Sequence, residues 1–167
     1  MEIIDGKLII TDEEFNKYQL YNKINRNEII DEEEINALEA VKQNGYALEY
    51  IENQTLEICL ESVKENGYAL CYVKDQTEEI CLEAVKQNGD SLYFVKKQTP
   101  EICLEAVKQE GLALEYVHNQ TKEICLEAVK QDGLALQFVK NQTPEICLEA
   151  VKQNKVSIKY INPKLIA

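Results

Sequence analysis

One segment recurs at a fixed spacing along most of this chain. The run QTPEICLEAVKQ begins at Gln98, and near copies of it begin at Gln54, Gln76, Gln120 and Gln142, always at the same interval. A period of about 22 residues is typical of repeat arrays. A unit of this length would lose about 30 kcal/mol of conformational entropy on folding, which is more than its few apolar side chains can offset. We therefore expect the copies to fold only as a stack, in which each unit covers its neighbour.

Each copy contains the signals of a short helix. Thr99 is a good N-cap, because its hydroxyl can accept a free backbone N–H of the first turn, and Pro100 and Glu101 suit the positions that follow. Gly111 is typical of the left-handed residue that ends a helix, so the pattern predicts a helix over residues 100–110. A second, shorter apolar segment, LALEYV, follows this glycine. The unit is therefore predicted to be a helical hairpin.

The same signals place six hairpins in residues 33–167. A degenerate copy precedes the five clear ones, where a capping-box pattern at Asp31 leads into ALEAVKQNG. First helices are expected near residues 32–44, 56–66, 78–88, 100–110, 122–132 and 144–154. Second helices are expected near residues 46–53, 68–75, 90–97, 112–119, 134–141 and 156–162. The repeats begin near residues 33, 55, 77, 99, 121 and 143. This organisation predicts an all-α fold, a right-handed α/α solenoid of about six such hairpins.

Residues 1–32 do not follow the repeat. Two short β-branched runs flank Asp5-Gly6, which is typical of a tight hairpin turn. After them, a capping-box pattern at Thr11 and apolar residues from Phe15 to Ile24 predict a helix of about a dozen residues. Because an open array would otherwise expose an apolar face at its end, we interpret this segment as an N-terminal cap.

Composition limits the classes of partner. The formal net charge is −12, and 45% of the residues are hydrophobic against 29% charged. These proportions are ordinary for a globular protein, but the charge argues against direct binding to nucleic acid phosphates or to an anionic membrane. Basic protein partners remain open. No apolar run is long enough to cross a bilayer, and the first residues lack the pattern of a signal peptide, so we expect an intracellular protein.

The sequence does not indicate catalytic chemistry. Five of the six cysteines occupy one repeat position, and stacked helices lie roughly 8 to 10 Å apart, too far for a disulfide or a shared zinc ion. We interpret these thiols as buried core residues, and Cys71 as a surface residue. The one histidine, His118, takes a position that other copies give to Glu or Lys. Because the chain also lacks a phosphate loop and metal-ligand spacing, we expect no enzyme activity and no catalytic, cofactor-binding or metal-binding residues.

Two further positions are nearly uniform along the array. The aromatic ladder consists of Tyr50, Tyr72, Phe94, Tyr116, Phe138 and Tyr160. Because these rings recur with the period of the packing, we interpret them as inter-repeat core rather than as a ligand cage. The glutamines before the cap threonines form a second series, the glutamine ladder: Gln54, Gln76, Gln98, Gln120 and Gln142. Each of them is expected to bond the free carbonyls at the end of the preceding second helix, or the other glutamines of this ladder.

The copies differ mainly at two positions of the second segment. These positions lie three residues apart on one face of a short helix, so stacking would place them in two adjacent columns. The first column contains Tyr46, Tyr68, Asp90, Leu112 and Leu134, and the second contains Glu49, Cys71, Tyr93, Glu115 and Gln137. Repeat proteins commonly recognise partners across several units, so one hypothesis is a protein-binding face anchored by the three tyrosines. The alternative is unconstrained drift on a solvent-facing surface.

A regular charge ladder on the first helices is a second candidate surface. A glutamate and a lysine three residues later recur in all six copies, from Glu39 with Lys42 to Glu149 with Lys152. Excess acid would suit mimicry of nucleic acid to block a nucleic-acid-binding protein, although the lysines neutralise much of this stripe. A third interpretation is an architectural part of an assembly, with self-association through the end repeats. The partner and the oligomeric state are not identified by these patterns.

Residues 37–161 resemble a known group of sequences. The phrase EICLEAVKQNGxALxYVxNQT is similar to the short helical repeats of uncharacterised proteins encoded by giant viruses of amoebae. The resemblance implies a viral protein that acts in the host cytoplasm or in the virion. That group has no assigned enzymatic residues, so the resemblance implies nothing catalytic. Taken together, these observations predict a non-enzymatic scaffold for protein–protein interaction.

Overall fold

The computed structural model describes residues 2–4, 7–9 and 32–165. Its contacts divide the chain into two compact units, Met1–Asn36 and Ala37–Ala167. In the first unit, strand β1 (Glu2–Ile4) pairs antiparallel with β2 (Lys7–Ile9), which confirms the expected hairpin. Its expected turn at residues 5–6 and the expected helix near residues 11–24 lie outside the described residues. The role of residues 1–32 as a cap stays a prediction.

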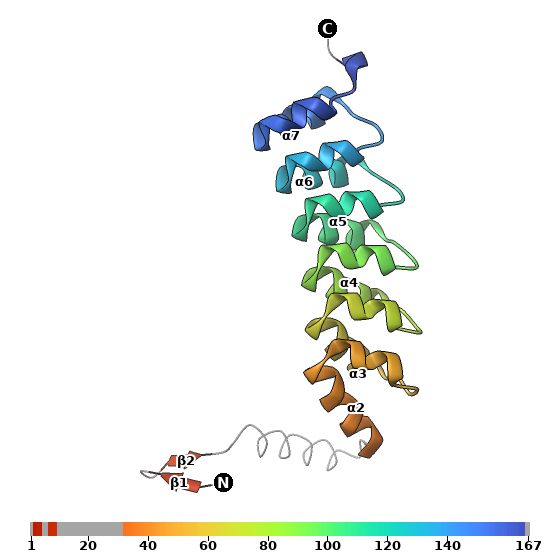
Figure 1. Cartoon of the computed structure of the whole chain (residues 1–167), viewed down its shortest axis with the longest axis vertical. Coiled ribbons are helices and arrows are strands. Elements are labelled where there is room, and N and C mark those ends of the chain that lie inside the picture. The colour runs from red at the N-terminus through yellow and green to blue at the C-terminus, as the bar shows by residue number, and fades with distance from the viewer. Residues whose placement is uncertain (1, 5–6, 10–31, 166–167) are drawn as a thin grey trace. The chain divides into compact units, whose positions relative to one another are not determined.

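The second unit is an α solenoid, as expected (Figure 1). Its α-helices are α2 (Glu32–Gln43, which begins in the first unit), α3 (Leu56–Glu65), α4 (Glu78–Gln87), α5 (Pro100–Gln109), α6 (Lys122–Gln131) and α7 (Pro144–Gln153). From α3 onward, consecutive α-helices contact one another, and each also packs on the second helix of its own repeat and of the repeat before it. The predicted first helices agree with these bounds to within one residue.

The second helices are 3₁₀-helices, not α-helices, and are shorter than predicted. They are η1 (Gly45–Tyr50), η2 (Gly67–Tyr72), η3 (Gly89–Phe94), η4 (Gly111–Tyr116), η5 (Gly133–Phe138) and η6 (Lys155–Tyr160), followed by the short η7 (Pro163–Leu165). Extended residues bound each of η1 to η6: the Asn66 side chain caps η2 by accepting the Tyr68 N–H, and Val73 ends it. A tight segment between two extended residues leaves no room for a longer α-helix.

The glycines of the repeats serve a different purpose from the expected one. Among the described residues, none of them adopts the left-handed conformation; α5 ends because Glu110 is extended, at φ −137° and ψ 108°. A Cβ atom on Gly111 would lie 2.5 Å from the carbonyl oxygen of Ala128 in the next repeat. The Gly111 N–H also donates to Gln131 Oε1 across the same contact, at 2.7 Å. Glycine is therefore required by the close approach of two backbones, and Lys155 replaces it where no further repeat follows in the described chain.

Between the repeats lies one continuous hydrophobic core. In α5 the buried face consists of Ile102, Cys103, Ala106 and Val107, and Leu114 of η4 is fully buried among them and their equivalents. In the last repeat, Ile158 occupies the position of Leu114 but is 61% exposed, and Leu148 and Val156 are exposed beside it. The interior residues are therefore covered by the following repeat, as the stacking argument requires.

The glutamine ladder links three consecutive segments of backbone. Gln76 Nε2 donates to the Leu70 carbonyl of the preceding second helix (3.2 Å) and to the Phe94 carbonyl of the following one (3.0 Å). Its Oε1 accepts the Lys96 N–H at 2.9 Å. Gln54, Gln120 and Gln142 make the equivalent bonds. The expected bond to the preceding helix is confirmed, and the bonds to the next repeat tie the stack together.

Replacing Gly111 by Ala should destabilise the array by about 1 to 3 kcal/mol, because the new methyl group forces the Ala128 backbone away. The control is Lys155→Ala, at the equivalent position without a following repeat, which should change stability by less than about 0.5 kcal/mol. Urea unfolding followed by far-UV circular dichroism measures both. Equal stability of the two variants would contradict the packing role of this glycine.

Replacing Gln76 by Leu should lower the free energy of unfolding by about 1 to 3 kcal/mol, since the Phe94 carbonyl and the Lys96 N–H lose a partner. Gln109→Leu is the matched control, because Gln109 is exposed and its side chain makes no hydrogen bond within the described part of the chain. The same unfolding experiment compares them. A Gln76 variant as stable as the control would remove the ladder from the forces that hold the stack.

Candidate protein-interaction surface

The ten residues of the two predicted columns all lie on the 3₁₀-helices η1 to η5, at the second and fifth positions of each. A 3₁₀-helix has three residues per turn, so residues three apart lie directly above one another. Tyr93, the aromatic residue of the second column, is exposed, whereas Tyr68, Asp90 and Leu134 of the first column are half-buried. Consecutive 3₁₀-helices contact one another, which brings these positions together along one side of the array.

Aromatic rings of the columns pack against rings of the ladder in the next repeat. Tyr46 meets Tyr72 with ring centroids 6.0 Å apart, and Tyr68 meets Phe94 at 6.1 Å, both edge to face. Tyr93 contacts Phe94 at 5.1 Å and Tyr116 at 5.4 Å, also edge to face. Tyr68, Phe94, Tyr93 and Tyr116 therefore form one connected group that spans η2, η3 and η4.

Carboxylates border this aromatic group. Burial, together with the negative charges of Asp90 and Glu115, raises the pKa of the Tyr116 phenol. In the pair formed by Tyr46 and Tyr72, the charge of Glu49 is the main cause that raises the pKa of the Tyr72 phenol. We call the set Tyr68, Asp90, Tyr93, Phe94, Glu115 and Tyr116 the aromatic–acidic cluster. Negative charge therefore contributes to the raised pKa of both phenols.

Two features that were predicted to be separate are joined in the structure. The aromatic ladder was predicted to lie in the core and the columns on the surface, but Phe94 and Tyr116 are only half-buried and the column rings rest on them. Tyr50 is 82% exposed, so its assignment to the core was wrong. In each copy the residue of the aromatic ladder lies four positions after the first-column residue, on the same short helix. This spacing is the signal in the sequence that the ladder and the columns are close to one another.

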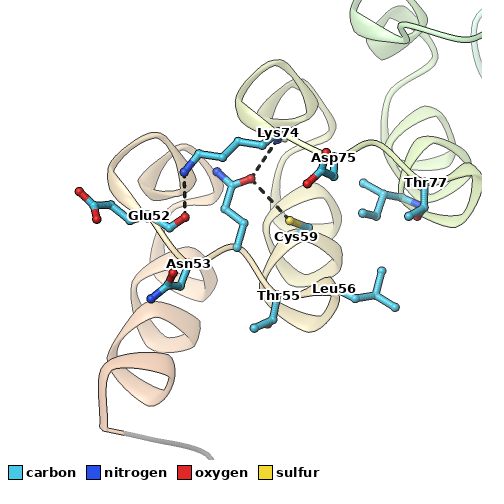
Figure 2. A pocket seen from close by; sticks show the side chains of 10 residues that line it. Glu52, Asn53, Thr55, Leu56, Cys59, Lys74, Asp75 and Thr77 are labelled. Atoms are coloured by element: carbon cyan, nitrogen blue, oxygen red, sulfur yellow. Dashed lines mark hydrogen bonds between the residues drawn. The ribbon is translucent and has the colours of Figure 1, made fainter.

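Two open hollows lie beside the loops that follow the 3₁₀-helices, one between the loops after η1 and η2 and one between the loops after η2 and η3. Figure 2 shows the first, of about 470 Å³, between Glu52, Asn53, Thr55, Leu56, Cys59, Lys74, Asp75 and Thr77. The Lys74 ammonium group donates to the Glu52 carbonyl at 2.8 Å, and Gln54 Oε1 accepts both the Lys74 N–H and the Cys59 thiol. Gln54 and Lys74, two of the polar residues at this hollow, therefore link neighbouring repeats.

The five cysteines that share one repeat position are buried, and Cys71 is exposed, as expected. We call the five the ladder cysteines: Cys59, Cys81, Cys103, Cys125 and Cys147. Each ladder thiol donates to the Oε1 atom of a glutamine, at 3.6 Å for Cys103 and Gln98. Burial raises the pKa of the Cys103 thiol, and the other ladder thiols shift in the same direction for the same main reason. All six cysteines are free, so the ladder thiols are weak nucleophiles inside the packing.

The remaining candidates are located on the surface. His118 is exposed, at the position where Lys74 links two repeats in an earlier copy. The charge ladder shows the expected internal pairing, for example between Glu105 and Lys108 at 3.7 Å, with equivalent pairs in the next two repeats. Among the residues that the structure describes, no group of three His, Cys, Asp or Glu side chains could hold a metal ion.

This geometry defines an α solenoid whose variable positions are gathered on one side, over a uniform core. Within the described ranges, no helix has both the length and the apolarity needed to span a membrane. The family described as a domain of unknown function, DUF4116, matches residues 55–98, 77–121, 99–142 and 121–166. The chain belongs to the DUF4116 family. No curated protein and no solved structure was found to match it.

One thiol of six should react rapidly with Ellman's reagent in the native protein, because only Cys71 is exposed. Partial desolvation by its neighbours and the charge of Glu49 raise its pKa above the ordinary value of 9.0, so little thiolate is present near neutral pH and the rate should keep rising as the solution becomes more alkaline. Absorbance of the released thiolate measures the reaction, and denaturant should release the other five. Cys71→Ser should abolish the fast phase; several fast thiols in the native wild type would contradict the buried ladder.

Proposed function

We propose that this protein is a non-enzymatic scaffold that binds a protein partner through the 3₁₀-helix side of its array. The observation that carries the proposal is Tyr93: its side chain is 67% exposed, yet its ring is held by contacts to Phe94 and Tyr116 from two repeats. An aromatic side chain that is exposed and already fixed in place loses little further entropy on binding. Such residues dominate the energetics of protein interfaces.

The arrangement of the columns supports the same proposal. The buried residues of the seam between repeats are nearly identical from copy to copy, whereas the column residues differ. The scaffold can therefore present different side chains in each unit at a constant backbone geometry. Tyr46 and Tyr68 extend the aromatic surface toward the N-terminal repeats, and Leu112 and Leu134 continue it as an apolar surface. An extended partner segment fits such a surface better than a small molecule does.

The charge distribution favours recognition through the aromatic columns over the alternative of nucleic acid mimicry. Three glutamates of the charge ladder are paired with lysines of the same helix, as in Glu127 with Lys130 at 3.7 Å. These pairs reduce the regularly spaced negative charge that a mimic of a phosphate backbone needs. The net charge of −12 also disfavours direct contact with nucleic acid and leaves basic proteins as the suitable class of partner.

A location in the host cytoplasm or in the virion is part of this proposal. It is supported by the resemblance of the repeats in residues 37–161 to those of giant viruses of amoebae, and by no other observation. Immunogold labelling of infected cells and of purified virions, with an antibody to this chain, tests it. Labelling in neither place would remove the viral part of the proposal and leave the scaffold role untouched.

The double variant Tyr68→Ala/Tyr93→Ala should weaken capture of a partner by at least about tenfold, because interface aromatics each contribute on the order of 1 to 2 kcal/mol or more. Immobilised wild-type protein captures partners from cell extract, mass spectrometry identifies them, and calorimetry with each purified partner measures affinity. The control is Leu56→Ala, which removes an exposed apolar side chain on α3, outside the 3₁₀-helices.

Circular dichroism establishes that both variants stay folded. Affinity is then measured at low and moderate salt, since a nucleic acid mimic should lose its partner steeply while an aromatic anchor should keep most of its affinity. Unchanged affinity of the double variant, or an equal loss in the control, would overturn the proposed binding side.

A further inference from the structure

We propose that the aromatic–acidic cluster is a binding site for an arginine side chain in an extended, basic segment of the partner. This inference rests on the proposed function and names the chemistry of the ligand. The site is built from η2, η3 and η4, so it exists only in the stacked array. It would recognise a cation through rings with accessible surface and two carboxylates that come from different repeats.

The rings provide the first half of the site. Tyr93 is edge to face with both Phe94 and Tyr116, so neither contact is a flat stack that would cover a face of both rings. Tyr68 packs edge to face on Phe94 from the preceding repeat. A guanidinium group can lie over an accessible ring face, where the quadrupole of the ring attracts positive charge. Tyr93, the most exposed of the four rings, is the main candidate for this contact.

The carboxylates provide the second half. Glu115 is exposed beside Tyr116, and Asp90 is half-buried one repeat earlier. Asp90 lies three residues before Tyr93 on the 3₁₀-helix η3, so both residues lie on the same face of that helix, and Glu115 directly precedes Tyr116 on η4. Burial is the main cause that raises the pKa of the Tyr116 phenol, and the charges of Asp90 and Glu115 raise it further. A negative charge that disfavours a phenolate favours a cation. Neither carboxylate has a lysine or arginine partner among the ion pairs of the described residues, in contrast to the paired glutamates of the charge ladder.

Arginine suits this combination better than lysine. Its planar guanidinium can stack on a ring while its edge donates to a carboxylate, whereas an ammonium group is a point charge that is more strongly hydrated. The same chemistry argues for a segment with a basic character, because the chain carries a net charge of −12 that attracts it over longer range. The net charge therefore attracts the segment, and the cluster selects the side chain.

Binding of nona-arginine to the full chain is the direct test. Nona-citrulline is the matched probe, since citrulline has nearly the shape of arginine without its charge. Fluorescence anisotropy of labelled peptides measures affinity at low and at moderate salt. Amide chemical shifts of the isotope-labelled wild type identify the site. We expect nona-arginine to bind at least about tenfold more tightly than nona-citrulline, with the largest shifts on η2 to η4.

Variants separate this site from the general charge. Asp90→Asn/Glu115→Gln should weaken nona-arginine binding about tenfold, and so should Tyr93→Ala. The control is Glu105→Gln/Glu127→Gln, which removes the same number of charges from α5 and α6, outside the cluster. It should change the affinity by less than about twofold after correction for salt.

Several results would overturn the inference. They are equal binding of the two peptides, an equal effect of the control variant, or chemical shifts centred on the charge ladder. The shift mapping needs no variant, so a misfolded variant does not block the test. Failure here is distinguishable from failure of the proposed function: a partner that needs Tyr68 and Tyr93 but is indifferent to Asp90→Asn/Glu115→Gln would keep the binding side and exclude the arginine site.

Discussion

The whole array depends on how closely one repeat can approach the next. At Gly111 and its equivalents the backbone comes so near the carbonyl oxygen of the following repeat that no side chain fits. This contact sets the spacing at which Leu114 becomes fully buried and at which Gln131 Oε1 reaches the Gly111 N–H. Close packing and hydrogen bonding between the units therefore require the same residue, and the period of the sequence reflects that requirement.

The glutamine ladder explains how such a short second helix can persist. A short 3₁₀-helix leaves carbonyls without partners at its end, and water is partly excluded there by the next repeat. Gln76 donates to one of these carbonyls, that of Phe94 in the following repeat, and adds a second donor to the Leu70 carbonyl, which already accepts the Val73 N–H. Its Oε1 atom also accepts the Lys96 N–H. One amide side chain therefore supplies the hydrogen bonds that backbone groups would supply in a longer helix or a sheet.

Most of the fold could be predicted from the sequence because its signals are local and repeated. The cap threonine, the buried face around Ile102 and the regular period gave the number of units and the first helices. The 3₁₀ geometry could not be predicted in this way, because it depends on extended residues at both ends, such as Asn66 and Val73. The glycine was placed correctly and explained wrongly, since its reason lies in the neighbouring repeat.

The candidate site was predictable only in part, for a related reason. Variation among the copies identified Tyr93, Asp90 and Glu115 as candidates, because these positions differ from copy to copy while the buried positions stay nearly identical. Comparison of the copies cannot show which ladder ring each of them meets, since that contact crosses from one repeat to the next. The uniform seam and the variable columns are thus consequences of one constraint: backbone approach fixes the positions between repeats, and only side chains outside that contact are left to differ in chemistry along the array.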